Sequence, residues 1–548
     1  MNRRQVVLCL VAALLVGLAL RTWPLWHSPL PFNPDGIVYA RLVNGTVASG
    51  QFPLAEMATD ELAFTALLTT VSHVTGMESL SHSQGVLAII GTVPVLFLAT
   101  VTARVSRQAG IGATGTRYAA CLAAWTLAIE GLYLHRSMPV DEQTVGLLLV
   151  PLGLVSVVYT AERDRRWWWV SAVTLGVLPA VHNLDAFVMA LALSLLIGIA
   201  LRRDRLGSPK LYLSISACYW LWFVGYTLLA DTLTAASVIQ QSRISAVPDL
   251  VLAWLLLIAV TFAWYVGQRA HLKRTLLALV LTGWFVILAL NAVTPIFPGL
   301  PQTNPTVLYG IAPLVVLVGL FAVGVPRTLD GDTGTTLVAL VGAVTVVVGI
   351  SLTAALTAEY LNTLYRVQTF AHFPVVAIAS TGAALAVGRQ AGAISAGTSS
   401  RSVAGALACL VLAASVASVP VAYGGLDVLS YKGVTTPAEL RSSGFVVDRV
   451  DDSWTGDDHL VRITPYHGSA DGRVEPTYAY LTGSPPPGCP MLVQRSWTTV
   501  GGQLYPRDPA AVSETRFVQL RVERNLVYAS GVDDRVFLSV PRGRSSGC

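Results

Sequence analysis

The sequence Pro31-Phe32-Asn33-Pro34-Asp35-Gly36-Ile37-Val38-Tyr39-Ala40-Arg41 comes soon after the first long apolar run of the chain, Val6–Leu20. It carries a carboxylate, Asp35, where the chain is expected to leave a membrane. Asn-Pro and Asp-Gly are turn dipeptides, so one interpretation is a plain solvated turn. The other is that Asp35 is held at the membrane boundary as a base or a ligand.

The composition is that of a membrane protein. Of the 548 residues, 53% are hydrophobic and 12% are charged, whereas about a quarter of a typical soluble chain is charged. The mean hydropathy is +0.61. The net charge of +5 comes without a dense cluster of basic and aromatic residues, so nucleic-acid binding is not expected. The composition predicts a polytopic α-helical protein in contact with the lipid bilayer.

Apolar runs that approach the length of about 20 residues needed to cross a bilayer recur along most of the chain. About thirteen transmembrane helices are expected, at Val6–Leu20, Val86–Val105, Tyr118–Leu134, Thr144–Thr160, Trp168–Val181, Ala186–Leu201, Leu211–Leu229, Leu250–Val266, Thr275–Ala292, Leu308–Val325, Thr336–Leu356, Phe373–Val387 and Val403–Val421. These spans define a membrane domain over residues 1–423.

The basic residues indicate how the chain is oriented, because cytoplasmic loops carry an excess of Lys and Arg. The N-terminus and alternate loops hold most of them, and the opposite loops hold little beyond Arg41, Arg136, Arg243 and Arg366. We therefore expect a multi-pass protein of the cell membrane with a cytoplasmic N-terminus. The first outward loop, 22–84, and the C-terminal tail would then lie outside the cell.

The tail, residues 424–548, has no further spanning run and predicts a small β-rich extracytoplasmic domain. Strands are expected at Phe445–Val447, His459–Ile463 and Phe517–Val522, and a hairpin is expected from Leu526–Tyr528 and Val536–Val540. Cys489 and Cys548 lie in this tail and could pair outside the cell, although their spacing alone does not establish a disulfide. No zinc-type spacing of Cys and His occurs, so a structural metal is not expected.

Ionisable residues gather in four places on the expected outward side, where such residues are costly and usually functional. The four clusters are Asp35 with Arg41; Glu130, His135, Arg136, Asp141 and Glu142; His182 with Asp185; and Glu359, Arg366 and His372. Each has a simpler interpretation: two acids at a helix start, a solvated turn, or an interfacial Arg that reaches the headgroups. Taken together, however, they suit one chemistry, in which Arg holds a phosphate leaving group and a carboxylate accepts the proton of an attacking hydroxyl.

This layout resembles the GT-C membrane glycosyltransferases, whose donors are polyprenyl-phosphate-linked sugars. Asn33-Pro34-Asp35-Gly36-Ile37-Val38-Tyr39-Ala40-Arg41 is similar to the first-loop acidic motif of oligosaccharyltransferase catalytic subunits. Arg136-Ser137 followed by Asp141-Glu142 looks like their second-loop motif. The resemblance in layout covers the whole chain, whereas the resemblance in amino-acid sequence covers only these two short motifs.

The chain departs from oligosaccharyltransferases in two places. Their soluble domain carries Trp-Trp-Asp-Tyr-Gly, whereas this tail offers only Asp452-Ser453-Trp454-Thr455-Gly456 and Arg495-Ser496-Trp497-Thr498. Their late outward loop carries a Glu, whereas Thr294–Thr306 has no acid. The better resemblance is to archaeal dolichol-phosphate-mannose mannosyltransferases. It implies transfer of one sugar, mannose by preference, from a dolichyl or polyprenyl phosphate to a hydroxyl of a glycan or glycoprotein acceptor, in protein N-glycosylation at the cell surface.

The resemblance also implies a role for each candidate residue. Asp35 is the general base of an inverting transfer, and Arg366, or else Arg136 or Arg243, holds the lipid phosphate. Asp141 and Glu142 orient the acceptor, or bind Mg²⁺ or Mn²⁺ with Asp35 if the site follows the oligosaccharyltransferase pattern. A hydroxyl acceptor does not require the metal, because base catalysis suffices. The full substrate-binding set is Arg41, Arg136, Asp141, Glu142, His182, Asp185, Arg243 and Arg366.

Other functions stay open at this point. An oligosaccharyltransferase-like enzyme would transfer a whole lipid-linked glycan to protein. A transporter or flippase of lipid-linked sugars belongs to a different class, and typically shows inverted repeats and polar residues at mid-membrane. A scaffold or sensor whose tail binds a partner is a third class.

Overall fold

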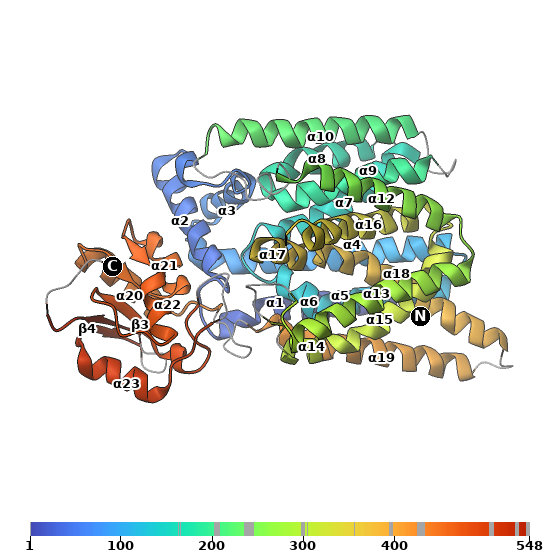
Figure 1. The fold of residues 1–548 in the computed structure, drawn as a ribbon. Coiled ribbons are helices and arrows are strands. Elements are labelled where there is room, and N and C mark those ends of the chain that lie inside the picture. Colours follow the sequence, from blue (N-terminus) through green and yellow to red (C-terminus); the bar gives the residue numbers. More distant parts are fainter. Residues whose placement is uncertain are drawn as a thin grey trace.

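The computed structural model shows a long helical bundle with a small domain containing a β-sheet at one end (Figure 1). The N-terminus lies at the opposite end of the bundle (Figure 1). The structure describes residues 2–548 except 163, 165, 202–208, 235–245, 297–301, 304, 356, 394–397, 425–432, 504–508, 532–535 and 544–547.

The bundle is built from helices that, apart from α17, overlap the predicted spans. They are α1 (Arg3–Thr22), α4 (Ser79–Gln108), α5 (Ala113–Ile129), α7 (Gln143–Glu162), α8 (Trp167–Val181), α9 (Asn183–Ala200), α10 (Pro209–Asp231), α12 (Pro248–Val266), α13 (Ala270–Val293), α14 (Pro305–Ile311), α15 (Val315–Thr328), α16 (Asp332–Thr353), α17 (Ala358–Val367), α18 (Thr369–Ala393) and α19 (Thr398–Ala422). Within the described residues, eleven helical segments are long and apolar enough to cross a membrane. The other two predicted spans correspond to the shorter helices α5 and α8. The protein is therefore a multi-pass membrane protein, and the count of thirteen stays a prediction.

Close packing of α15 on α18 depends on two glycines. A Cβ on Gly324 would lie 2.3 Å from the carbonyl oxygen of Ile378, and one on Gly382 would lie 2.1 Å from that of Leu320. Small residues let helix backbones approach in this way in membranes, where van der Waals packing holds helices together. The outer helices α12 and α13, in contrast, expose apolar side chains such as Leu257, as expected for a surface that faces lipid.

The first loop holds two helices, α2 (Pro34–Ser49) and α3 (Leu62–Thr75). The predicted turn around Asp35 is the start of α2: Asn33 is the N-cap, and its side-chain oxygen accepts the N–H of Asp35 at 3.2 Å. Pro at the first helical position and an acid in the first turn both favour a helix start.

The C-terminal domain is mixed α/β. It comprises α20 (Pro437–Arg449), β1 (Trp454–Thr455), α21 (Asp458–Ile463), η5 (Thr464–Tyr466), β2 (Gly472–Arg473), α22 (Glu475–Leu481), β3 (Met491–Gln494), η6 (Arg495–Thr498), α23 (Glu514–Glu523), β4 (Asn525–Ser530) and β5 (Val536–Val540). The sheet order is β2-β1-β3-β5-β4; β1 runs parallel to β2 and β3, while β5 is antiparallel to β3 and β4. A disulfide joins Cys489 to Cys548.

The predicted hairpin is confirmed as β4 and β5, but the other three predicted strands are wrong. Phe445–Val447, His459–Ile463 and Phe517–Val522 lie in α20, α21 and α23. Each helix begins at a polar N-cap, and α20 has a complete capping box. Short apolar runs fit a strand and a buried helix equally well. The polar N-caps are what favour helices in these three segments.

Candidate functional site

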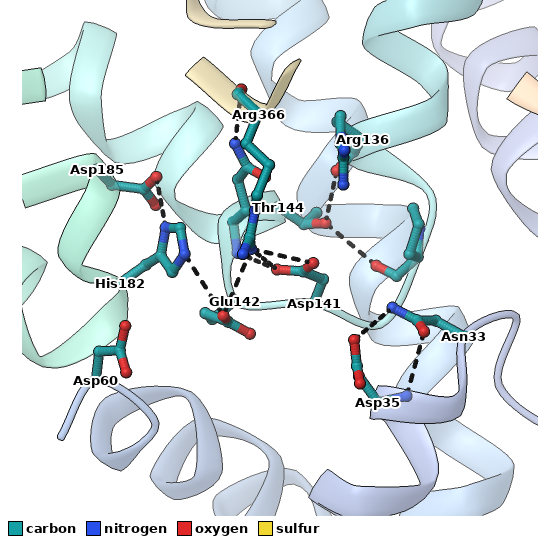
Figure 2. A network of polar contacts seen from close by, with 12 residues as sticks. Asn33, Asp35, Asp60, Arg136, Asp141, Glu142, Thr144, His182, Asp185 and Arg366 are labelled. Atoms are coloured by element: carbon teal, nitrogen blue, oxygen red, sulfur yellow. Dashed lines mark hydrogen bonds and ion pairs between the residues drawn. The ribbon is translucent and has the colours of Figure 1, made fainter. Parts of the chain in front are cut away.

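Polar side chains from five segments meet in one cluster (Figure 2), at the end of the bundle that faces the C-terminal domain (Figure 1). The segments are the start of α2, the loop before α3, the loop between α6 (Gly131–Ser137) and α7, the junction of α8 and α9, and α17. These segments are far apart in the sequence, so the cluster forms only when the bundle is assembled.

Arg366 on α17 holds the paired acids before α7. Its Nη2 lies 3.5 Å from Asp141 Oδ1 and 3.8 Å from Glu142 Oε1. Its Nε donates to Gln143 Oε1 at 3.2 Å, and Gln143 donates to the backbone carbonyl of Arg366 at 3.0 Å. All three charged side chains are largely buried, so the guanidinium is fixed in position rather than extended toward solvent.

His182, at the junction of α8 and α9, lies between Asp185 and Glu142 (Figure 2). Its Nδ1 is 2.8 Å from Asp185 Oδ1, and its Nε2 is 3.6 Å from Glu142 Oε1. The adjacent Asp185 carboxylate raises the pKa of His182 to about 9, against the lowering effect of burial. His182 is therefore a cation near neutral pH, and it points at the same oxygen of Glu142 as Arg366 does.

Gly146 on α7 leaves the room that Asp185 occupies. A Cβ at this position would lie 1.4 Å from Asp185 Oδ2. The Asp185 carboxylate thus rests against the backbone of α7, and no side chain larger than that of glycine fits there.

The two paired acids have opposite electrostatics. Burial and the neighbouring Asp141 charge raise the pKa of Glu142 well above its ordinary value. The pKa of Asp141 is lowered, because Arg366 and His182 outweigh the effect of burial. The Tyr39 hydroxyl also donates to Glu142. Asp141 therefore carries the negative charge of the pair, while Glu142 retains a proton more readily.

Asp35 lies at the edge of this cluster and is half-exposed. Its Oδ2 accepts a hydrogen bond from Asn33 Nδ2 at 3.1 Å, and its Oδ1 lies 3.2 Å from Arg462 Nη1 of the C-terminal domain. Arg41, predicted beside Asp35, instead pairs with Glu56. Asp35 is therefore half-exposed beside a cluster of buried charges.

The remaining candidates fall in different places. Arg136 lies in the last turn of α6, where its carbonyl oxygen accepts a hydrogen bond from Thr144 at 3.3 Å. Its charge contributes to the lowered pKa of Asp141. Arg243 and the side chain of Glu359 lie outside the described residues. Glu130 and His372 form a separate ion pair at 2.8 Å.

Sequence reasoning missed Asp60, Glu61 and Tyr39. Asp60 Oδ2 accepts the N–H of Asn183 at 3.2 Å, and its charge adds to the high pKa of Glu142. The signal was present, since Asp60 and Glu61 directly precede the apolar run Leu62–Leu68, a pattern typical of a helix start.

Glu61 gives a pH-dependent prediction. Burial raises its pKa from 4.5 to about 7, although the N–H of Ala58 donates to it at 2.7 Å. A raised carboxyl pKa in the folded state lowers the free energy of unfolding as pH rises from about 4.5 to 7. Glu61→Gln should therefore raise the thermal midpoint of the purified protein at pH 8 but not at pH 4.5. The control is Glu78→Gln, on an exposed side chain; a change of equal size at both pH values would contradict the prediction.

The acids considered as metal ligands are occupied by cations. Arg462 contacts Asp35, and Arg366 contacts Asp141 and Glu142. Across the described part of the chain, no group of three or more His, Cys, Asp or Glu residues has the arrangement to hold a metal ion. The residues as arranged do not fit a metal.

Comparison with solved structures gives the class of fold. An oligosaccharyltransferase of Archaeoglobus fulgidus in the apo form superimposes with a TM-score of 0.52 at 12% identity, over 88% of this chain and 66% of that one. The arabinofuranosyltransferase AftD from mycobacteria gives a TM-score of 0.47 at 14% identity, over 100% of this chain and 40% of that one. No family model and no curated protein sequence matches. The chain thus has a membrane fold like that of the oligosaccharyltransferase, and it spans less than two thirds of that protein's length.

Proposed function

We propose that the protein is an inverting glycosyltransferase that moves a sugar from a polyprenyl-phosphate carrier to a hydroxyl of a glycan acceptor. One observation carries the proposal: in a fold like that of an oligosaccharyltransferase, a half-exposed carboxylate, Asp35, lies at the edge of a cluster that holds the buried cations Arg366 and His182 (Figure 2). A base beside a phosphate-binding site is what such a transfer needs.

Asp35 is the general base. Its carboxylate accepts the proton of the acceptor hydroxyl, whose oxygen attacks the anomeric carbon of the sugar. The new carbon–oxygen bond forms as the bond to the phosphate oxygen breaks, and the carrier leaves as polyprenyl phosphate with the bonding pair. Attack opposite the leaving group inverts the anomeric carbon.

Arg366 and His182 bind the departing phosphate. Both approach Glu142 Oε1, at 3.8 and 3.6 Å. Because the pKa of Glu142 is raised, its carboxyl takes up a proton more readily. Protonation removes one of the negative charges that face the two cations and so favours an incoming phosphate, while Arg366 keeps its contact with Asp141 and His182 its contact with Asp185. Charge-assisted contacts of this kind are the strong ones in a water-poor site.

The same proposal includes the identity of the substrates and the place of the reaction. The sugar is mannose, the carrier is a dolichyl phosphate, and the acceptor belongs to protein N-glycosylation. The site lies on the outer face of the cell membrane. The disulfide between Cys489 and Cys548 supports an outward C-terminal domain, since disulfides persist in oxidising compartments. Transfer of a whole lipid-linked glycan to protein is the second candidate, favoured by the likeness in fold to an oligosaccharyltransferase.

Glycan mass spectrometry of a strain lacking this protein tests the proposal. Surface glycans shortened by one sugar, and restored by the wild-type chain, are the expected result. Glycans missing from protein but intact on their lipid carrier would instead establish the oligosaccharyltransferase activity. Unchanged glycans would rule out both.

A further inference from the structure

We propose that Arg462 of the C-terminal domain is a positioning residue for Asp35, so that this domain completes the catalytic site of the bundle. The inference rests on the proposed function for what Asp35 does. It assigns to α21 a role in the reaction itself, beyond any role of the domain in binding an acceptor.

The contact between the two side chains is direct. Arg462 Nη1 lies 3.2 Å from Asp35 Oδ1, while Asn33 Nδ2 donates to Asp35 Oδ2 at 3.1 Å. Each carboxylate oxygen thus faces one donor, and the two donors come from different domains. The side chains of Arg462 and Asp35 are 44% and 40% exposed, so an acceptor can still reach the carboxylate.

Arg462 stands on a helix that a buried network holds in place. The Asp457 side chain caps α21 by accepting the N–H of Leu460 at 3.0 Å. The same carboxylate accepts hydrogen bonds from Gln494 at 2.5 Å and from Trp497 at 2.8 Å. These bonds tie α21 to β3 and η6, so the backbone beneath Arg462 is rigidly placed.

Asp35 stands on a helix that is equally well held. Ile37, two residues further along the same helix, is fully buried in a core that includes Trp454 and Leu460 of the C-terminal domain. On the other side, a Cβ on Gly36 would lie 3.0 Å from the Cβ of Val140, next to the paired acids. The start of α2 is therefore clamped between the second outward loop and the C-terminal domain.

The ion pair is not needed to hold the domains together. Half-exposed ion pairs contribute little to stability, whereas complete burial of an isoleucine such as Ile37 contributes much more. Asn44 also donates to the Tyr466 hydroxyl at 3.2 Å across the same interface. Removal of the Arg462 guanidinium should therefore leave the interface intact and change only how the Asp35 carboxylate is held.

In the part of the chain that the structure describes, two neighbouring arginines make other contacts. The guanidinium of Arg366 is engaged by Asp141 and Glu142, and that of Arg41 by Glu56. A base must lie within hydrogen-bond reach of the hydroxyl it deprotonates, and a displacement of about 1 Å can lower a rate by about a hundredfold. A contact that fixes the position of the Asp35 carboxylate is therefore expected to raise the rate of transfer.

The first test needs no substrate. The full chain in lipid nanodiscs is treated with a water-soluble carbodiimide and glycine ethyl ester, and labelling of Asp35 is followed by peptide mass spectrometry. Arg462→Ala should speed labelling of Asp35 several-fold, while Arg462→Lys stays near wild type. Arg473→Ala is the matched control, because Arg473 forms a half-exposed ion pair of the same length, 3.2 Å, with Asp471 in the same domain. Equal labelling in Arg462→Ala and wild type would overturn the proposal.

The second test measures transfer from a polyprenyl-phosphate-linked sugar. Arg462→Ala should lower kcat by about 10- to 100-fold with the KM for the donor unchanged, and Arg462→Lys should recover most of the loss. An unchanged kcat in Arg462→Ala, or no recovery with lysine, would contradict a positioning role. If wild type shows no transfer, the proposed function fails, and the labelling result alone decides whether Arg462 holds Asp35.

Discussion

Asp35→Asn is expected to lower the rate of sugar transfer by at least about a hundredfold, because a positioned general base contributes about 10²- to 10⁴-fold. The amide keeps the shape of the side chain but cannot accept the proton of the acceptor hydroxyl. The fold should survive, since Asn33 still caps α2 and the Asp35 side chain is 40% exposed. The measurement is the initial rate of transfer from a polyprenyl-phosphate-linked sugar, with the purified protein in nanodiscs.

The control is Asp164→Asn. Asp164 lies in the loop between α7 and α8, where its carboxylate accepts the N–H of Arg166 at 2.9 Å and lies 3.9 Å from the Arg166 guanidinium. This variant should transfer sugar at the wild-type rate. If Asp35→Asn keeps its transfer rate within a few-fold of wild type, Asp35 is not the general base. Another acid of the cluster, such as Asp60, would then have to be the base.

Gly146→Ala is expected to destabilise the protein by about 1–3 kcal/mol or more, the typical effect of overpacking a buried site. The new Cβ would fall 1.4 Å from Asp185 Oδ2 and 2.2 Å from its Cγ. Asp185 would have to move, and its 2.8 Å contact with His182 would be lost. We expect a lower thermal midpoint and, because His182 no longer points at Glu142, a fall in transfer of at least about tenfold.

Two further variants separate the effects on stability and on transfer. Gly176→Ala, on the neighbouring α8, places its Cβ where nothing lies within 4 Å, so it should be neutral or slightly stabilising. Combining Gly146→Ala with Asp185→Ala removes the carboxylate that the new methyl group meets. The double variant should regain much of the thermal midpoint while transfer stays low. If Gly146→Ala alone unfolds at the wild-type temperature, the close approach of Asp185 to α7 is not as described.

The membrane helices and the chemistry of the loops could be read from the sequence. A spanning helix is a local property, because every backbone polar group in lipid must be satisfied within the segment and about 20 apolar residues suffice. The hairpin of β4 and β5 was equally local. The three wrong strands, in contrast, were short apolar runs whose type was decided by polar caps and by packing in the C-terminal domain.

Composition and position also marked Asp35, Asp141, Glu142, His182, Asp185 and Arg366 as residues to examine, since charge is rare in this chain and these residues sit at helix ends. Sequence could not say which of them meet. The pairing of Arg366 with Asp141 spans 225 residues of chain and exists only because α17 packs beside the start of α7. The approach of Asp185 to α7 depends on a glycine, and the contact of Arg462 with Asp35 depends on the docking of a second domain. The sequence by itself therefore determined the helices and the residue types at their ends, because burial in a bilayer acts on each segment separately. Only the tertiary structure decided the site, because the contacts of the site join segments that helix packing brings together.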